Sequence, residues 1–168
     1  MARVIIFFGL MLVVRVSVAG PIADYFLSGY GGVAWGTSLT DLVGVFSQGE
    51  HHFSTAPGER VYIVRNDEPL LGVPRLGSTI QYHLGKDGGV EAIAVDVPYE
   101  RRDQLMGTLL SLFGGYATQR VVGSAISYYW TPDHGISLST RSSQSPKNGI
   151  LEFWISRISN DKASTRTK

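Results

Sequence analysis

The histidines are the residues of this sequence with the clearest capacity for catalysis or metal binding. There are four of them, His51, His52, His83 and His134. His51 and His52 are adjacent, so on a strand they point to opposite faces and cannot share one metal ion unless the chain bends. The sequence has no cysteine and no two histidines at the i, i+4 spacing of a helical metal site. We therefore expect no metal site and no cofactor, and interpret the histidines as strand and turn residues.

Patterns that indicate a nucleophile or a phosphate loop are absent or misplaced. No Gly-x-Ser-x-Gly turn occurs in the sequence. Ser159-Asn160-Asp161-Lys162 fits the Ser-x-x-Lys pattern of penicillin-binding enzymes, but it lies in a polar tail with no helix to activate the lysine. The glycines from Gly29 to Gly32 have neither the lysine nor the strand–helix setting of a phosphate loop. We predict no catalytic residues and a protein that is not an enzyme.

The segment from Gly77 to Gly114 has the most regular pattern in the chain. Apolar and polar residues alternate in Ser78–Leu84, which predicts a strand, and Lys86–Gly89 has the Asp-Gly chemistry of a hairpin turn. Val90–Val97 returns as a second strand, and Pro98, with no N–H to donate, ends it. Leucines then recur at helical spacing from Glu100 until Gly114.

The rest of the chain predicts a second copy of this arrangement. A helix with an apolar stripe begins after Ser38, which forms a capping box with Asp41, and extends to Phe46. Each half of the chain thus has a helix followed by antiparallel strands. We therefore predict an α+β fold, an antiparallel sheet with two short helices on one face, built as a tandem repeat. The further strands are predicted at His51–Ser54, Glu59–Arg65, Ala125–Trp130, Ile136–Thr140 and Ile150–Arg157.

The first nineteen residues have the pattern of a secretory signal peptide. Arg3 precedes an apolar run from Val4 to Val14, and Ser17 and Ala19 are the small residues of a cleavage site. The run is shorter than the roughly 20 residues that span a bilayer. An uncleaved membrane anchor is the alternative interpretation. We predict an exported protein, periplasmic or extracellular, with a signal peptide at 1–19, a leader at 20–32, one domain at 33–158 and a disordered polar tail at 159–168.

Composition limits the partners of the exported chain. Without Arg3 and Arg15, 13 of the 15 basic residues remain against 14 acidic ones, a net charge of −1. A nucleic-acid-binding domain needs clustered basic residues, so we expect no nucleic-acid partner. Beyond the signal segment no apolar run is long enough to cross a membrane, so we expect no stable insertion after cleavage. With no cysteine, the domain must be stabilised by packing rather than by disulfides.

Counting in steps of two along the predicted strands divides the sheet into a helix side and an open side. The helix side would receive Ile80, Tyr82, Leu84, Ile93, Val95, Tyr128, Trp130, Ile136, Leu138, Leu151, Phe153 and Ile155. The open side would receive Gln81, His83, Tyr129, Ser137, Ser139, Arg141, Glu152 and Trp154, together with Tyr62. Because tyrosine, tryptophan and arginine often anchor interfaces, the candidate partner-binding residues are Tyr129, Trp154, Arg141, His83, Gln81 and Tyr62. The alternative is that the leader or a loop shields the aromatic residues.

The segment from Trp35 to Val43 resembles the helix opening of small exported bacterial domains. It has a glycine, a hydroxyl-rich cap and an apolar-striped helix before antiparallel strands. In this it is similar to the SmpA/OmlA-type outer-membrane assembly lipoproteins and to the β-lactamase inhibitor proteins, which carry the helix-plus-sheet unit twice. This chain has neither a lipobox cysteine nor cysteine pairs. The resemblance implies the fold and binding to a protein, and assigns no residues.

Three functions follow as hypotheses. The first is a non-enzymatic, envelope-associated or inhibitor-like domain that binds a protein through the open face or rim of its sheet. The second is a small-molecule-binding protein or small hydrolase with a cleft near His83, Asp133 and His134. The third is a structural envelope component without a specific partner. Whether Trp154 is exposed in the folded chain is the most useful single observation for testing the first of these.

Overall fold

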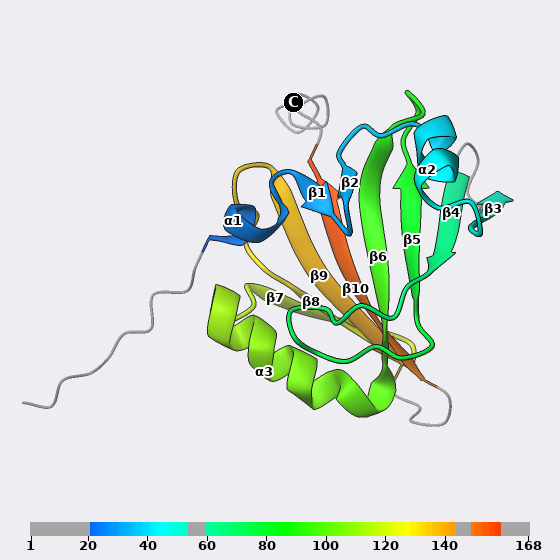
Figure 1. Cartoon of the computed structure of the whole chain (residues 1–168). Coiled ribbons are helices and arrows are strands. Elements are labelled where there is room, and N and C mark those ends of the chain that lie inside the picture. The colour runs from blue at the N-terminus through cyan, green and yellow to red at the C-terminus, as the bar shows by residue number, and fades with distance from the viewer. Residues whose placement is uncertain (1–20, 54–59, 144–148, 159–168) are drawn as a thin grey trace, which may run out of the picture.

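The computed structural model describes residues 21–53, 60–143 and 149–158 (Figure 1). The predicted signal peptide at 1–19 and polar tail at 159–168 lie outside the described residues. Three α-helices are present, α1 (Ile22–Phe26), α2 (Leu39–Val45) and α3 (Arg102–Phe113), the last preceded by a 3₁₀ turn, Tyr99–Arg101. Two short strands, β1 (Gly29–Tyr30) and β2 (Val33–Ala34), pair as a separate ribbon.

The main sheet has eight antiparallel strands in the order β3-β4-β5-β6-β10-β9-β8-β7. β6 and β10 meet at its centre, and each half of the chain supplies a meander of four strands that follows one helix, α2 or α3. The predicted α+β class, and the same order of elements in both halves, are therefore confirmed. The strands are β3 (Glu50–Phe53), β4 (Arg60–Arg65), β5 (Thr79–Leu84), β6 (Val90–Pro98), β7 (Thr118–Val122), β8 (Ala125–Tyr129), β9 (Ile136–Ser143) and β10 (Ile150–Arg157).

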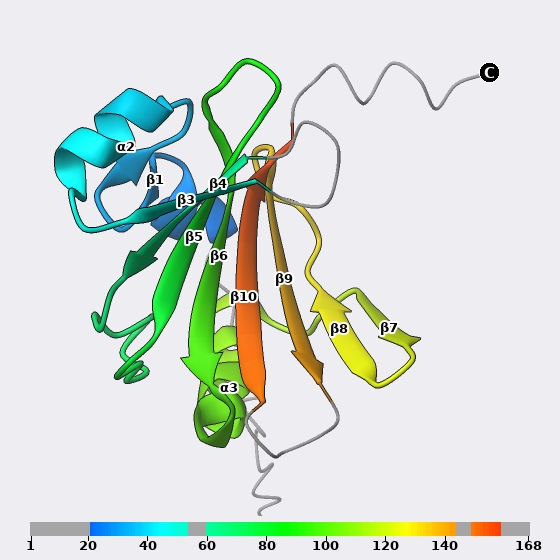
Figure 2. The same cartoon turned by 90° about the vertical axis from the view of Figure 1, so that its right-hand side faces the viewer.

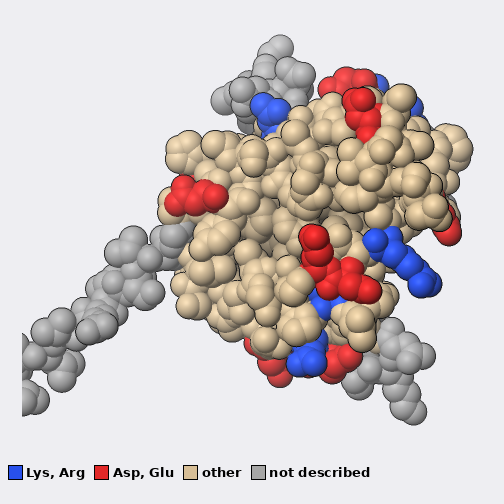
Figure 3. Space-filling model, viewed as in Figure 1, with Lys and Arg blue, Asp and Glu red and all other residues tan. Residues whose placement is uncertain are grey.

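The helices pack on one face of this sheet, which we call the helix face (Figure 1). Leu42 of α2 and Leu105 and Leu109 of α3 are completely buried there. All twelve residues predicted for the helix side belong to the core or pack against it, with Tyr128 partly buried. Period-two alternation thus predicted this face correctly, because one side of each strand must be apolar to bury the helices. On the outer surface of the helix side, described charges of both signs are scattered and form no basic patch (Figure 3).

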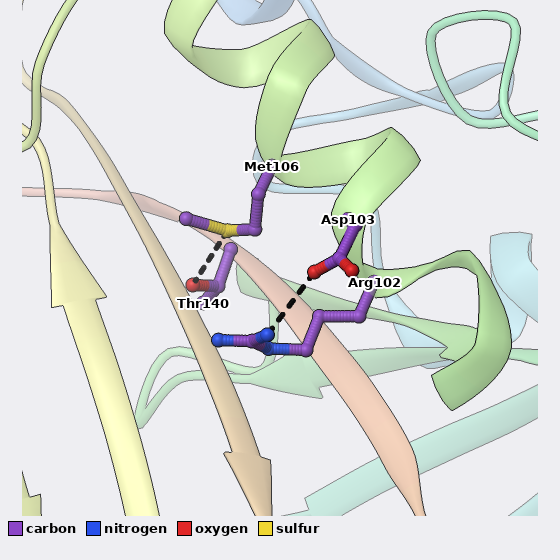
Figure 4. Close-up of polar contacts among 4 residues, drawn as sticks. All are labelled: Arg102, Asp103, Met106 and Thr140. Carbon is purple, nitrogen blue, oxygen red and sulfur yellow. Dashed lines mark hydrogen bonds and ion pairs between the residues drawn. The ribbon is translucent and has the colours of Figure 1, made fainter.

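A side-chain cap marks the start of α2, and two further polar contacts involve α3. The Asp41 backbone N–H donates to Ser38 Oγ at 3.2 Å, as the predicted capping box requires. Thr140, on the helix face of β9, is completely buried, and its hydroxyl donates a hydrogen bond to Met106 Sδ of α3 at 3.8 Å (Figure 4). At the start of α3, Arg102 pairs with Asp103 at 3.1 Å (Figure 4).

Two elements depart from the sequence prediction. The supposed leader contains α1, whose Ile22 and Phe26 belong to the main core, and Trp35 Nε1 donates to the Phe26 carbonyl at 2.9 Å. The segment between Gly114 and Ala125, in which no strand is predicted, contains β7, every residue of which is exposed. A short helix and an outer strand both lack the long periodic pattern that sequence analysis relies on. Since α1 lies on the helix face, it does not shield the aromatic residues of the open side.

A pair of core tyrosines offers a direct test of the packing. Tyr62 and Tyr82 are opposite each other on β4 and β5, and both are buried. The Tyr62 hydroxyl donates to the Phe46 carbonyl at 2.5 Å, whereas the buried Tyr82 hydroxyl has no hydrogen-bond partner among the described residues. We expect Tyr62→Phe to lower the free energy of unfolding by about 1 kcal/mol, and Tyr82→Phe to leave it unchanged or raise it. Urea unfolding of the two matched variants measures this. Equal losses would show that Tyr82 also has a partner.

Candidate functional site: the open face of the sheet

The open face is the side of the sheet opposite the helices (Figure 2). Strand register aligns its side chains in rows that cross the sheet. One row runs through Ile63, Gln81, Ala94, Trp154, Ser139, Tyr129 and Thr118. The next row runs in register through Asp96, Glu152, Arg141, Ser127 and Arg120, and a hydrogen bond from Thr79 to Asp96 connects it with the pair Arg65 and Thr79. The predicted placement of Gln81, His83, Tyr129, Arg141 and Trp154 on this side is confirmed.

The two halves of this face differ in accessibility. On β4, β5 and β6, which we call the N-terminal half, Val61, His83, Ala94 and Asp96 are buried. On β10, β9, β8 and β7, the C-terminal half, the side chains of these rows are partly or fully exposed. In the N-terminal half Ile63, Thr79 and Gln81 are partly exposed and Arg65 is exposed, so the C-terminal half is the more accessible part of the open face.

Trp154 lies at the boundary between the two halves. Its partner in register on β6 is Ala94, which is completely buried although it is on the open face. The Trp154 ring lies 4.6 Å from the His83 ring, centroid to centroid, and its Nε1 donates to Glu152 Oε2 at 3.1 Å. A hydrogen-bonded indole held against a second ring is fixed in place while remaining partly exposed. Such a residue presents apolar area with little conformational entropy left to lose on binding.

Tyr129 and two arginines form the outer part of the C-terminal half. The Arg120 guanidinium lies over the Tyr129 ring at 5.5 Å from its centroid, a cation–π contact. Arg120 and Arg141 are in the same row on either side of Ser127, and both are exposed. Neither arginine forms an ion pair with any residue that the structure describes. Sequence analysis missed Arg120 because it did not recognise β7.

Two carboxylates are neighbours where β6 and β10 meet. Asp96 and Glu152 are partners in register, and Asp96 is buried. Thr79 Oγ1 donates to Asp96 Oδ2, and Gln81 Nε2 lies 3.5 Å from Asp96 Oδ1. Burial raises the pKa of Asp96, the Glu152 charge raises it further, and the hydrogen bonds oppose the shift. Because its pKa is raised, ionisation of Asp96 costs the folded state stability.

This arrangement predicts how stability depends on pH. Because the pKa of Asp96 is higher in the folded than in the unfolded chain, the folded state binds the proton more tightly. The contribution of Asp96 to stability then falls as pH rises from its ordinary pKa of 3.8 through the raised folded value. We expect Asp96→Asn to raise the melting temperature at pH 7, with the gain shrinking as pH falls through that window. Thermal melts at several pH values measure it, with Glu91→Gln, a change of an exposed carboxylate on the same strand, as the control. A gain that is the same at every pH would contradict the argument.

Two of the six predicted partner-binding residues need correction. Tyr62 lies on the helix face and is buried, because it pairs with Tyr82 rather than with the open-face row. His83 is on the open face, as predicted, but is 8% exposed and lies against Trp154. Gln81 is partly exposed and approaches Asp96. Trp154, Tyr129, Arg141 and Gln81 remain as the accessible candidates, the first three of them in the C-terminal half.

The structure does not bring His83 and His134 into one cleft. His134 lines a shallow hollow of about 480 Å³ together with Ala23, Asp24, Leu27 and Ser28, beside α1 on the helix side of the sheet. Asp133 Oδ1 lies 2.6 Å from His134 Nδ1, while its Oδ2 accepts from the Ala23 backbone N–H at 3.0 Å. That backbone hydrogen bond, followed by the interaction with His134, lowers the pKa of Asp133. Asp133 thus fastens the start of α1, whose own cap, Pro21, offers no side-chain hydrogen bond.

Comparison with family models, with curated proteins and with solved structures found no match for this chain. The function of this chain must therefore be inferred from its own geometry. Among the described residues, no three histidine, cysteine or acidic side chains are grouped as metal ligands. None of the described helices has the length and apolar character needed to cross a membrane.

Proposed function

We propose that this chain is a non-enzymatic, exported protein-binding domain that engages its partner through the C-terminal half of the open face. The observation that carries the proposal is the partly exposed Trp154, held by Glu152 and His83, in one row with Tyr129. Tryptophan, tyrosine and arginine are enriched among the few residues that contribute most of the binding energy at protein interfaces, and here they are gathered on one accessible surface.

The residues between these anchors also suit an interface. Ser127, Ser137, Ser139 and Ser156 alternate with the aromatic and charged side chains. Small hydroxyl residues let a partner approach the neighbouring rings and adapt their hydrogen bonds to it, as they do in antibody paratopes. Neighbouring strands are about 4.8 Å apart, so two intervening spacings place Trp154 and Tyr129 roughly 10 Å apart. A surface of this extent fits a protein better than a small molecule, which needs a concave pocket.

Export and an envelope-associated or inhibitor-like role complete the proposal. The apolar run from Val4 to Val14 and the small residues before Gly20 support export. The envelope or inhibitor role rests on the resemblance of Trp35–Val43 to small exported domains.

The test is recovery of partners from envelope extract with immobilised wild-type protein and two variants. Trp154→Ala/Tyr129→Ala should lower recovery of the specific partner at least tenfold, because each anchor typically contributes more than about 1 kcal/mol. Leu110→Ala, a change of a 42% exposed side chain on α3, is the matched control and should recover the partner as the wild type does. Circular dichroism confirms that all three proteins are folded. Equal recovery by the double variant and the control would refute the proposal.

A further inference from the structure

We propose that the partner contributes an extended segment that adds to β7 as a ninth strand of the sheet. This inference rests on the proposed function and specifies how the partner binds. β7 is the last strand in the sheet order, next to the accessible half of the open face. Figure 2 shows the β7–β8 hairpin standing clear of α3. All five residues of β7 are exposed.

The hairpin geometry determines which backbone groups face outward. Val122 and Ala125 flank a two-residue loop that begins with Gly123, whose φ is 58°, as a type II′ turn requires. Such a loop closes on a hydrogen-bonded pair, and bonding then alternates along the strand. The N–H and C=O groups of Thr118, Arg120 and Val122 therefore point to β8. Those of Gln119 and Val121 point away from the sheet and are available to another strand.

A hydrogen bond between the end of β8 and β9 agrees with the same alternation. The Trp130 N–H donates to the Leu138 carbonyl of β9 at 3.1 Å, so the even-numbered residues at the end of β8 face β9. Their partners in register on β7, which are odd-numbered, must then face away from β8. The outward direction of Gln119 and Val121 is thus supported from both ends of the hairpin.

The two edges of the sheet are protected to different degrees. Natural proteins block exposed edges with charged side chains, proline or bulges, because an open edge templates strand addition. β3, at the other edge, is one residue shorter and has Glu50, His51 and His52 among its four residues. β7 has one charge, Arg120, no proline, and a register without a shift over five pairs. Val121 and Val122, 56% and 76% exposed, also favour a β conformation. Of the two edge strands, β7 is therefore the one better suited to pair with an added strand.

The charge of Arg120 favours a segment of another protein over a second copy of this chain as the added strand. If two β7 strands paired antiparallel with Gln119 opposite Val121, both Arg120 side chains would be directly opposite each other, which is unfavourable. A partner strand with an acidic residue at that position would instead pair with Arg120. Arg141, exposed in the same row, extends the positive surface towards Trp154. The occupant we infer is an extended polypeptide that carries carboxylates on its open-face side.

The test uses peptides selected from a random 12-residue phage-displayed library on the immobilised wild-type chain, with Trp154→Ala/Tyr129→Ala as a counter-selection. Backbone amide exchange of the free protein and its complex is followed by NMR. We expect the Gln119 and Val121 amides to exchange fast in the free protein and at least tenfold more slowly in the complex. Val121→Pro removes an outward N–H without removing a bond to β8, and should weaken peptide binding at least tenfold. Val121→Thr keeps that N–H and should bind as the wild type does.

The outcomes separate this inference from the proposed function. Peptides that need Trp154 and Tyr129 but leave the Gln119 and Val121 amides unprotected would overturn the added strand and support the open face alone. A library with no binder that depends on the two aromatic residues would overturn both. Protection that appears without peptide, as protein concentration rises, would show a second copy at the edge and overturn the assigned partner. If Val121→Pro does not fold, protection in the wild-type complex decides the question.

Discussion

Replacement of Arg75 by methionine is expected to lower the free energy of unfolding by more than about 3 kcal/mol, because it would leave several buried acceptors without a donor. Arg75 lies in the loop between β4 and β5 and is completely buried. Its Nε donates to the Glu68 carbonyl at 2.8 Å, and one terminal nitrogen donates to the Asp96 carbonyl at 2.9 Å. The other terminal nitrogen donates to the Asn66 carbonyl and side chain at 2.9 and 2.7 Å.

Through these hydrogen bonds, the guanidinium connects the loop of residues 66–78 to the central strand β6. Burial lowers the pKa of Arg75, and the surrounding oxygens compensate for the lost hydration. Arg75→Lys should also be destabilising, because an ammonium group cannot donate in the planar, forked geometry of a guanidinium. Arg65→Met, on the exposed end of β4, is the matched control and should change stability by less than about 0.5 kcal/mol. Guanidinium chloride unfolding monitored by tryptophan fluorescence measures all three. A loss at Arg75 no larger than at Arg65 would contradict the role given to these hydrogen bonds.

The burial of Arg75 and its hydrogen-bond partners could not be predicted from the sequence. Arginine is mostly exposed in proteins, and a loop rich in glycine and proline gives no periodic pattern that would place it inside. Its partners Asn66 and Asp96 are 9 and 21 residues away, and only the folded chain brings them together. The faces of β5, β6, β9 and β10 were predictable, by contrast, because alternation within a strand is a local property that burial of one face enforces.

For the candidate site, too, the sequence predicted only those features that follow from alternation within a strand. Period two placed Trp154, Tyr129 and Arg141 on the open face, but it could not show that His83 is buried against Trp154. It also misplaced Tyr62, for which the neighbouring strands had to be paired before its face was defined. Nor could it show that the C-terminal half is the more accessible one, because that depends on contacts between segments distant in sequence. The edge position of β7 follows from the sheet order, which no single segment contains.

The second large effect is expected at Phe26, in the segment that sequence analysis treated as a leader. Phe26 of α1 is 1% exposed, and its ring centroid lies 6.1 Å from that of Phe113 of α3 and 5.8 Å from that of Phe153 of β10. It thus fills the space between a helix of the second half and a central strand. Removing a buried phenylalanine ring in this setting costs about 3–5 kcal/mol, from lost apolar burial and from the cavity left behind.

We therefore expect Phe26→Ala to lower the free energy of unfolding by about 3–5 kcal/mol. Leu27→Ala, the next residue, is the matched control: Leu27 is 59% exposed, so its truncation should change stability by less than about 0.5 kcal/mol. Urea unfolding of both variants measures the difference. If the two variants lose the same small amount, α1 is only loosely attached and the leader interpretation was right. A large loss at Phe26 alone would show that residues 22–26 are part of the domain, so that a fragment beginning at Val33 would lack part of its core.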